Sequence, residues 1–207
     1  MNYFLTGTDT GVGKTYVAAL LIRALRKAGF DTVGLKPICC GDRADAEELH
    51  AAADGELSID DVNPVWFRVP AAPYAASIVE NRLPDLDQIR DRFARIRAAR
   101  HSLIVEGVGG WLVPILQNYS VADLAAEMRL PVVVVAANRL GVLNHTLLTV
   151  EAIKSRGLTC AGVILNNIAA QPDTATSTNR SVLEHLLEVP VLYEVEIGQT
   201  ELRLGVA

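Results

Sequence analysis

The chain has 207 residues, of which 50% are hydrophobic and 21% are charged. This composition is typical of a folded protein with a full core, and it excludes a mainly disordered chain. The net charge of −5 disfavours a protein that binds nucleic acid through a basic surface. Because a domain holds roughly 150 residues, we expect a single domain over residues 1–207.

Short apolar runs alternate with longer amphipathic segments, which is the pattern of a parallel sheet covered by helices on both faces. The expected strands are residues 2–6, 32–36, 102–106, 132–137, 160–166 and 191–195. The expected helices are residues 14–28, 85–99, 120–128, 144–156 and 181–187. Residues 169–178 are polar and rich in turn formers, so we expect a mobile loop there.

Three further features of the sequence indicate where in the cell the protein is located. Cys39 and Cys40 are adjacent and Cys160 is distant, which predicts neither a disulfide framework nor a zinc site. The N-terminus lacks the charged start of a secretory signal. The longest plainly apolar run, residues 131–137, falls far short of the roughly 20 residues that span a bilayer. We therefore expect a cytoplasmic protein with no membrane partner.

The strongest signal is the segment from Gly7 to Thr15, between the first strand and the first helix. Its glycines let backbone N–H groups turn toward phosphate oxygens, and the following helix offers its positive end. Lys14 supplies a charge for the β- and γ-phosphates, and Thr15 supplies a hydroxyl ligand for Mg²⁺. Thr8 stands where the standard pattern has its first glycine. The segment predicts a P-loop for a nucleoside triphosphate, and hence a P-loop NTPase-like α/β fold.

A lysine ends the second expected strand. Ligands of open α/β sheets bind at the carboxyl ends of the strands, so Lys36 is expected to face the P-loop. The next segment, residues 38–48, is rich in carboxylates, and Mg²⁺ usually takes one or two of these from a protein. Spacing alone does not choose among Asp42, Asp45, Glu47 and Glu48.

An acidic residue, Glu106, ends the third apolar strand. A carboxylate at this position is similar to the Walker B arrangement, in which it helps to hold Mg²⁺ beside the P-loop hydroxyl. The glycines that follow it, Gly107, Gly109 and Gly110, allow close approach of phosphate or substrate. The pattern predicts metal ligation by Glu106 together with Thr15.

Together these motifs resemble the dethiobiotin synthetase family of the biotin pathway. The matching segments are residues 6–15, 34–37, 105–111, 141–149 and 162–167. The opening Thr-Gly-Thr-Asp-Thr, with its shifted glycine, is distinctive of that family. The resemblance covers most of the chain, from residue 2 to near residue 195.

The resemblance implies an ATP- and Mg²⁺-dependent cyclo-ligase that forms the ureido ring of dethiobiotin from 7,8-diaminononanoate and CO₂ or bicarbonate. One amine would become a carbamate, whose oxygen attacks the γ-phosphate. The second amine would attack the resulting carbamic–phosphoric anhydride. The resemblance also implies a homodimer with the substrate site at its interface. A fixed ammonium at Lys36 suits the carbamate anion, while Lys14 and Mg²⁺ offset the charge of the γ-phosphate.

The resemblance also assigns roles to single positions. It implies that Lys36 and Lys14 are catalytic and that Thr15, Asp45 and Glu106 hold the metal. The implied nucleotide contacts are Gly11, Val12, Gly13, Lys14, Thr15, Tyr16, Asp45, Glu106, Gly107, Val108, Gly109, Asn166 and Asn167, with Asn166 on the adenine. The implied substrate contacts are Lys36, Cys40, Leu143 and Asn144. The last two open a helix, whose positive end suits a carboxylate from across the interface.

Three positions depart from the family pattern. Cys40 stands where the family often has a substrate-contacting serine, and a thiol is a poorer hydrogen-bond partner. Some members place a partner-subunit tyrosine near residues 178–180, where this chain offers Arg180 instead. Residues 193–196, Tyr-Glu-Val-Glu, replace the usual Gly-Glu-Ile-Pro that opens the nucleotide-base loop. The resemblance therefore does not predict the base preference.

Two other classes of protein share parts of this pattern. A nucleotide-switch ATPase of the ParA or MinD type binds DNA or membrane, but it carries an extra lysine early in the P-loop, and residues 6–9 contain none. A related ATP-dependent amide-forming synthetase, such as those of cobalamin assembly, is disfavoured because the sequence has no glutaminase domain and no evident Cys–His nucleophile. Dependence of phosphate release on the diamine separates the ligase from the switch ATPase.

Overall fold

The computed structural model describes residues 1–169 and 171–204. Its centre is a six-stranded, fully parallel sheet with the order β10-β9-β8-β1-β5-β2. The strands are β1 (Asn2–Gly7), β2 (Val33–Leu35), β5 (Leu103–Gly110), β8 (Val132–Asn138), β9 (Cys160–Asn167) and β10 (Val191–Val195). They coincide with the six strands expected from the sequence, which confirms the predicted α/β fold.

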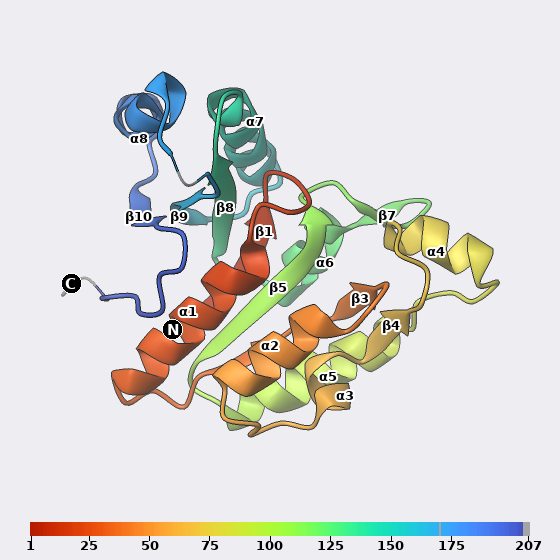
Figure 1. The fold of residues 1–207 in the computed structure, drawn as a ribbon. Helices are drawn as coiled ribbons and strands as arrows, with labels where there is room; N and C mark the ends of the chain where they lie inside the picture. Colours follow the sequence, from red (N-terminus) through yellow and green to blue (C-terminus); the bar gives the residue numbers. More distant parts are fainter. Residues whose placement is uncertain (170, 205–207) are drawn as a thin grey trace.

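Helices cover both faces of this sheet. Figure 1 shows α1 and α2 in front of the sheet and α6 and α7 behind it. The helices are α1 (Lys14–Lys27), α2 (Ala44–Ala52), α3 (Ile59–Val62), α4 (Pro73–Val79), α5 (Leu86–Ala99), α6 (Val121–Met128), α7 (Val142–Ser155) and α8 (Thr174–Leu186). The chain moves from β1 to one side of the sheet and later returns to the other side. The carboxyl end of β1 therefore lies at a switch point, where open α/β sheets bind their ligands.

Several short elements lie outside the expected set. β3 (Ile38–Cys40) pairs in parallel with β4 (Val65–Phe67), and β6 (Pro114–Leu116) pairs antiparallel with β7 (Tyr119–Ser120). Strands of two or three residues and a single-turn helix such as α3 are too short to carry a hydrophobic period. The helices α2, α3 and α4 are also outside the set expected from the sequence.

The expectation of a mobile loop over residues 169–178 is wrong from Thr174 onward, where the helix α8 begins. The Asp173 carboxylate accepts a hydrogen bond from the Thr176 backbone N–H at 2.8 Å, and the Asp173 N–H donates to the Thr176 hydroxyl at 2.7 Å. This reciprocal cap satisfies backbone donors at the helix start, so polar residues open a helix rather than a loop. Residue 170 of the expected loop lies outside the described residues.

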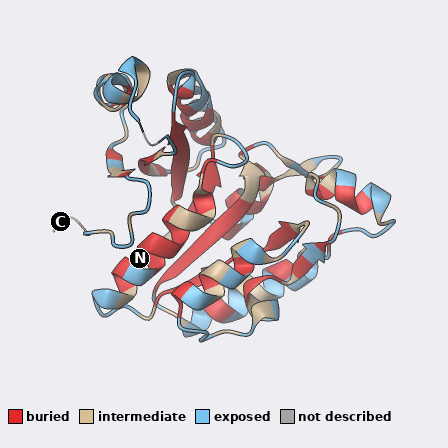
Figure 2. Ribbon diagram, viewed as in Figure 1, coloured by how far each residue is buried: buried red, intermediate tan, exposed pale blue. Residues whose placement is uncertain are grey.

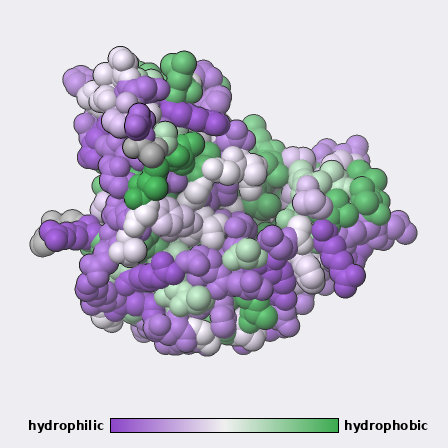
Figure 3. All heavy atoms as spheres, in the orientation of Figure 1, coloured by the Kyte–Doolittle hydropathy of each residue, from purple (hydrophilic) through white to green (hydrophobic). Residues whose placement is uncertain are grey.

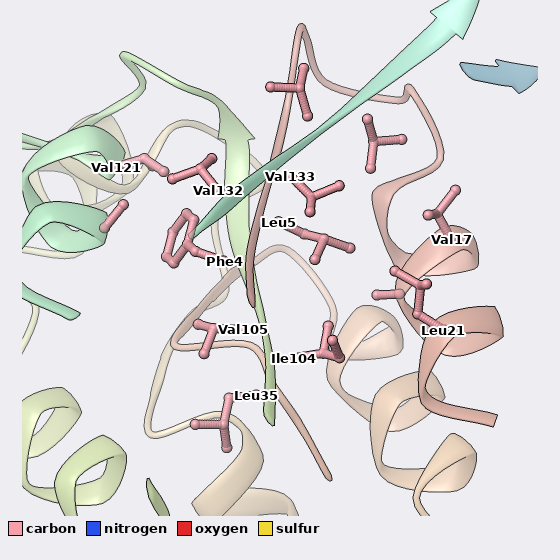
Figure 4. Close-up of a cluster of buried hydrophobic side chains, with 14 of the residues drawn as sticks. Phe4, Leu5, Val17, Leu21, Leu35, Ile104, Val105, Val121, Val132 and Val133 are labelled. Atoms are coloured by element: carbon pink, nitrogen blue, oxygen red, sulfur yellow. The ribbon is translucent and has the colours of Figure 1, made fainter. Parts of the chain in front are cut away.

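The core is built in two layers, one on each side of the sheet. In Figure 4, Phe4 points toward Val121 of α6, whereas Leu5 points toward Val17 of α1. All four side chains are at most 1% exposed. Figure 2 shows the same arrangement across the molecule, with buried residues concentrated in the strands and on the inner sides of the helices. Each fully buried aliphatic or aromatic side chain contributes roughly 1.5–3 kcal/mol to stability.

One glycine of β2 sets the approach of two helices. A Cβ on Gly34 would lie 2.7 Å from Ile22 of α1 and 2.9 Å from Leu49 of α2. Only a residue without a side chain lets both helices pack this closely against the strand. The close packing brings Lys36, just beyond β2, near Asp45 on α2.

The surface is polar over most of the face seen in Figure 3, with apolar side chains gathered over α4. Ile78 and Val79 of that helix are 63% and 69% exposed. Within residues 1–169 and 171–204, none of the helices has both the length and the apolar character that crossing a bilayer requires.

Candidate functional site

The predicted P-loop forms a turn at the carboxyl end of β1. Gly11 and Gly13 have φ angles of 72° and 85°, in the left-handed region that favours glycine. The side chain of Asn166, at the end of β9, packs directly against the loop, because its Nδ2 donates to the Val12 carbonyl at 3.0 Å. A Cβ on Gly13 would lie only 2.1 Å from that same Nδ2. The loop conformation and its seat on β9 therefore both require glycine at position 13.

A cavity of about 780 Å³ lies beside the loop. This volume falls within the range of small-molecule and nucleotide sites. Its walls come from the P-loop, the start of α1, β3, the end of β5 and the turn before α4. The predicted site residues that line it are Gly11, Gly13, Lys14, Thr15, Tyr16, Lys36, Cys40, Asp45, Glu106, Val108 and Gly109.

A buried lysine joins two carboxylates at the floor of the cavity. The Lys36 side chain is 2% exposed, and its Nζ lies 2.6 Å from Asp45 Oδ2 and 2.5 Å from Glu106 Oε1. The Thr15 hydroxyl donates to the same Glu106 oxygen at 2.9 Å. The structure thus brings Lys36 to the P-loop side of the sheet, as expected, and gathers the three predicted metal ligands around it.

The charges in this cluster depend on one another. Burial acts to lower the pKa of Lys36, but the negative charges of Glu106 and Asp45 outweigh it and hold the pKa above its usual value. Burial raises the pKa of Glu106, although Lys36 opposes the shift. Burial also acts to raise the pKa of Asp45, yet the charge of Lys36 prevails and lowers it. The cluster therefore holds Lys36 as an ammonium and Asp45 as a carboxylate.

The donor set around this lysine fits Mg²⁺. Thr15, Asp45 and Glu106 offer hard oxygen atoms, and Mg²⁺ is usually held by one or two carboxylates together with phosphate and water. Glu106 Oε2 is buried and has no hydrogen-bond partner among the described residues. A buried acceptor without a partner is costly, so this oxygen is suited to meet a further cation or donor.

The second lysine of the cavity lies in an unusual electrostatic environment. Lys14 is 6% exposed, and its Nζ donates to the Asp9 carbonyl at 3.2 Å. Burial, followed by the nearby positive charge of Lys36, lowers the pKa of Lys14 to about 8. Unlike Lys36, Lys14 has no carboxylate within ion-pair distance among the described residues, so an anion bound beside it would favour its ammonium form.

Two substrate contacts implied by the resemblance, Leu143 and Asn144, do not line the cavity of this chain. They lie in the first turn of α7, after Gly141 with a φ angle of 93°. Asn144 is exposed and Leu143 is half-buried. Arg180, the cation near the position of the partner tyrosine, pairs within its own chain with Glu184 at 3.0 Å and Glu194 at 3.6 Å.

Four other predicted nucleotide-site residues have structural partners. Val12 is buried in the core, and Asn166 is hydrogen-bonded to it as described above. Gly107 lies against the core, since a Cβ there would be 3.0 Å from Val121. Asn167 Nδ2 donates to Glu194 at 3.2 Å and to Glu196 at 3.0 Å, at the ends of β9 and β10.

Cys40 lines the cavity as a neutral thiol. Burial raises its pKa to about 11, and burial raises the pKa of the neighbouring Cys39 to about 12. A neutral thiol is a weak hydrogen-bond donor and a weak acceptor, so Cys40 would form weaker hydrogen bonds with a substrate than a serine hydroxyl would.

Sequence reasoning missed part of the cavity wall. The missed lining residues are Cys39, Pro70, Ala71, Ala72 and Val113, whereas Thr10 of the predicted P-loop and Asp42, one of the four candidate carboxylates, also line the cavity. The two prolines that flank residues 71–72 were a signal that a turn leads into a helix here. Pro73 lies in the first turn of α4, a position that proline favours.

The chain matches the family described as AAA domain over residues 1–199. It is similar to the ATP-dependent dethiobiotin synthetase of Akkermansia muciniphila, with 45% identity over 205 residues that cover 99% of this chain and 96% of the relative. The enzyme of the same name from Anaeromyxobacter dehalogenans is 46% identical over 188 residues, covering 88% of this chain and 84% of the relative. That from Bacillus velezensis is 37% identical over 196 residues, covering 92% and 84%.

Among solved structures, the chain resembles the septum site-determining protein MinD from Pyrococcus horikoshii, with a TM-score of 0.57 and 17% identity over 95% of this chain and 82% of that one. It also resembles a ParA family ATPase from Chlorobium tepidum, with a TM-score of 0.56 and 12% identity over 96% and 85% of the two chains. At such low identity these likenesses show a common P-loop fold and nothing of a switch function.

Proposed function

The chain belongs to the dethiobiotin synthetase family of ATP-dependent ligases in biotin biosynthesis, and from that premise we propose that it closes the ureido ring on 7,8-diaminononanoate. The carbon comes from CO₂ or bicarbonate, and ATP drives the closure. The substrates, the intermediates and the residues in each role are part of this proposal.

The observation that carries the proposal is the pair of buried ammonium groups, Lys14 and Lys36, in one cavity beside the P-loop. The reaction must bring a carbamate anion against the γ-phosphate of ATP, and these two anions repel each other. Positive charges fixed on both sides of the reacting atoms lower that barrier without reorganising in the transition state. A site for the nucleotide alone has less need of a second buried lysine.

The proposed reaction has three steps. First, one amine of the diamine bonds to CO₂ and loses a proton, and Lys36 stabilises the carbamate formed. Next, a carbamate oxygen attacks the γ-phosphorus, and the bond to ADP breaks while Lys14 offsets the charge on the phosphates. Finally, the second amine attacks the carbonyl carbon, the bond to phosphate breaks, the attacking nitrogen loses a proton to the departing phosphate, and the ring closes.

Mg²⁺ is proposed to be held by Thr15, Asp45 and Glu106, where it would supply further positive charge to the phosphates. These residues bring hard oxygen atoms to one end of the cavity, and Glu106 Oε2 has no other partner among the described residues. The backbone of residues 11–16 is proposed to bind the phosphates. Val108 and Gly109 are proposed to lie beside the transferred group.

Asn166 is proposed to contact the adenine through Oδ1, which is buried and lacks a hydrogen-bond partner among the described residues. We also propose a homodimer in which Leu143 and Asn144 complete the partner's cavity and bind the substrate carboxylate. The exposed side chains of Leu140 and Leu148, at 83% and 62%, support an interface along α7. Cys40 is proposed to contact the diamine.

The deciding experiment measures phosphate release with ATP and Mg²⁺, in the presence and absence of 7,8-diaminononanoate plus bicarbonate. We expect release only with both additions, together with one dethiobiotin per phosphate by mass spectrometry. Release that continues without the diamine would contradict the proposal and favour a nucleotide-switch ATPase.

A further inference from the structure

The three carboxylates that line the cavity differ in their partners. Asp45 and Glu106 both pair with Lys36, at 2.6 Å and 2.5 Å between the charged atoms. Asp42 lines the same cavity but makes no ion pair with any residue of 1–169 and 171–204. Its Oδ1 accepts a hydrogen bond from the Ala44 N–H at 3.2 Å. Asp42 therefore brings to the cavity a negative charge that no cation of the described chain pairs with.

The backbone beside Asp42 is held in place from several sides. Gly41, the residue before it, has a φ angle of 92° and donates its N–H to the Phe67 carbonyl at 2.9 Å. The Gly41 carbonyl accepts a hydrogen bond from Trp66 Nε1 at 2.8 Å. A Cβ on Gly41 would lie 3.2 Å from Pro70, which is another residue of the cavity wall. The turn between β3 and α2 thus keeps Asp42 at the wall next to the turn before α4.

The cation that is nearest in the sequence is engaged elsewhere. The Arg43 guanidinium pairs with Asp60 of α3 at 3.0 Å, and its Nε donates to Asn63 Oδ1 at 3.1 Å. The cations that line the cavity are Lys14 and Lys36. In the proposed reaction these two serve the phosphates and the carbamate, so the partner that suits Asp42 is a cation supplied by a ligand.

The chemistry of that ligand follows from the rest of the cavity, and this step rests on the proposed function. Cys40 and residues 70–72, Pro-Ala-Ala, line the cavity with small and mostly apolar side chains, which suit the carbon chain of a diamine. Aliphatic amines carry a proton near neutral pH. The ammonium groups of Lys14 and Lys36 would repel a protonated amine, so a carboxylate without a cationic partner on the same wall favours its binding.

We propose that Asp42 binds the protonated amine of the diamine and thereby selects a cationic substrate. A second ammonium beside the first is disfavoured by repulsion, so the other amine stays neutral and is free to react with CO₂ near Lys36. The Asp42 side chain is exposed, so the bound ammonium can pass its proton to water before that amine closes the ring. Asp42 is thus a specificity-determining residue at the diamine end of the cavity.

The test compares Asp42→Asn with Asp91→Asn. Asparagine at position 42 keeps the size of the side chain and an oxygen that accepts the Ala44 N–H, so only the charge is removed. Asp91 lies on α5 and is exposed, so its replacement makes the same change in net charge away from the cavity.

We expect Asp42→Asn to raise both the Kd and the KM for 7,8-diaminononanoate about tenfold, the lower end of the effect of a hydrogen bond to a charged group, because the position is exposed. The Kd for Mg·ATP should stay within about twofold and kcat within about threefold. Raising the salt from about 0.05 to 0.5 M should weaken diamine binding to the wild type and narrow its difference from the variant. Asp91→Asn should match the wild type in all of these values.

Calorimetric titration with the diamine needs no turnover, so it decides this proposal separately from the proposed reaction. A wild type that binds the diamine but releases no phosphate would refute the proposed function, and the titration of Asp42→Asn would still decide the role of Asp42. An unchanged diamine Kd in Asp42→Asn, or an equal effect of Asp91→Asn, would overturn the proposal. An equal loss of affinity for Mg·ATP would also overturn it, because Asp42 would then serve the metal or the nucleotide.

Discussion

Replacing Gly13 by alanine tests how the P-loop is seated on β9. Two separate effects meet at this position. Gly13 has a φ angle of 85°, and a Cβ there would lie 2.1 Å from Nδ2 of Asn166. Gly11 provides the matched control, because its φ angle is 72° while a Cβ there would meet nothing within 4 Å. Gly11→Ala therefore introduces backbone strain alone, and Gly13→Ala adds the collision.

The expected magnitudes follow from these contacts. An alanine in the left-handed region costs about 1–2 kcal/mol, which is the full effect expected for Gly11→Ala. In Gly13→Ala the Asn166 side chain must also move, which breaks its 3.0 Å hydrogen bond to the Val12 carbonyl. A buried polar group left without its partner costs about 1–3 kcal/mol more. We expect Gly13→Ala to lower the free energy of unfolding by about 2–5 kcal/mol in total.

Urea denaturation of the wild type, the single variants Gly11→Ala, Gly13→Ala and Asn166→Ala, and the double variant Gly13→Ala/Asn166→Ala measures these values. Removing the Asn166 side chain eliminates the collision, so the double variant should be more stable than the sum of the single effects by about 2 kcal/mol. Equal losses for Gly11→Ala and Gly13→Ala, or additive losses at positions 13 and 166, would refute the reasoning.

Two further predictions concern single charges. Lys14→Ala should abolish phosphate release, and normal release by this variant would contradict the proposed role of Lys14. The free energy of unfolding should change by less than about 1 kcal/mol, because the only hydrogen-bond partner of Lys14 Nζ among the described residues is the Asp9 carbonyl. Partial burial acts to raise the pKa of Asp123, but hydrogen bonds from Ser120 and Arg156 outweigh burial and lower this pKa. The contribution of the Asp123 carboxylate to the free energy of unfolding is therefore complete above about pH 4, and it is lost as the pH falls through the lowered pKa. Asp123→Asn should therefore cost about 1 kcal/mol at pH 7 and almost nothing at acidic pH in urea denaturation, and a deficit that persists at low pH would contradict this account.

The sheet could be predicted from the sequence because its strands are covered on both faces. Every residue of β8, Val132–Asn138, is buried, so the sequence shows one continuous apolar run. The P-loop could also be predicted, because a glycine-rich segment that ends in Gly-Lys-Thr between a strand and a helix is typical of nucleotide binding. Lys36 and Glu106 could be predicted at the cavity because parallel strands bring their carboxyl ends to one edge.

The part of the cavity wall formed by β3 and by the turn before α4 could not be predicted, because the conformation of these segments depends on tertiary contacts. The Asn63 side chain donates to the carbonyls of Lys36 and Val65, at 2.8 Å each, and so fixes the path into β3 and β4. The sequence around residue 63 does not indicate that its side chain makes these two hydrogen bonds. The hydrogen bond from the Tyr16 hydroxyl to the Gln199 carbonyl, at 2.5 Å, is a similar case, because nothing near residue 16 in the sequence indicates this partner. The short helix α2 was missed although it carries Asp45.

The most direct test of the proposed chemistry is Lys36→Gln, measured in two ways on the same preparation. If Lys36 stabilises the carbamate, diamine-dependent phosphate release should fall by about 100-fold or more, while the Kd for Mg·ATP changes by less than about threefold. Circular dichroism and urea denaturation verify that the variant is folded, since Lys36 also neutralises the buried Glu106. Equal losses in turnover and in ATP affinity would mean that Lys36 serves the nucleotide, and the proposed carbamate chemistry would be wrong.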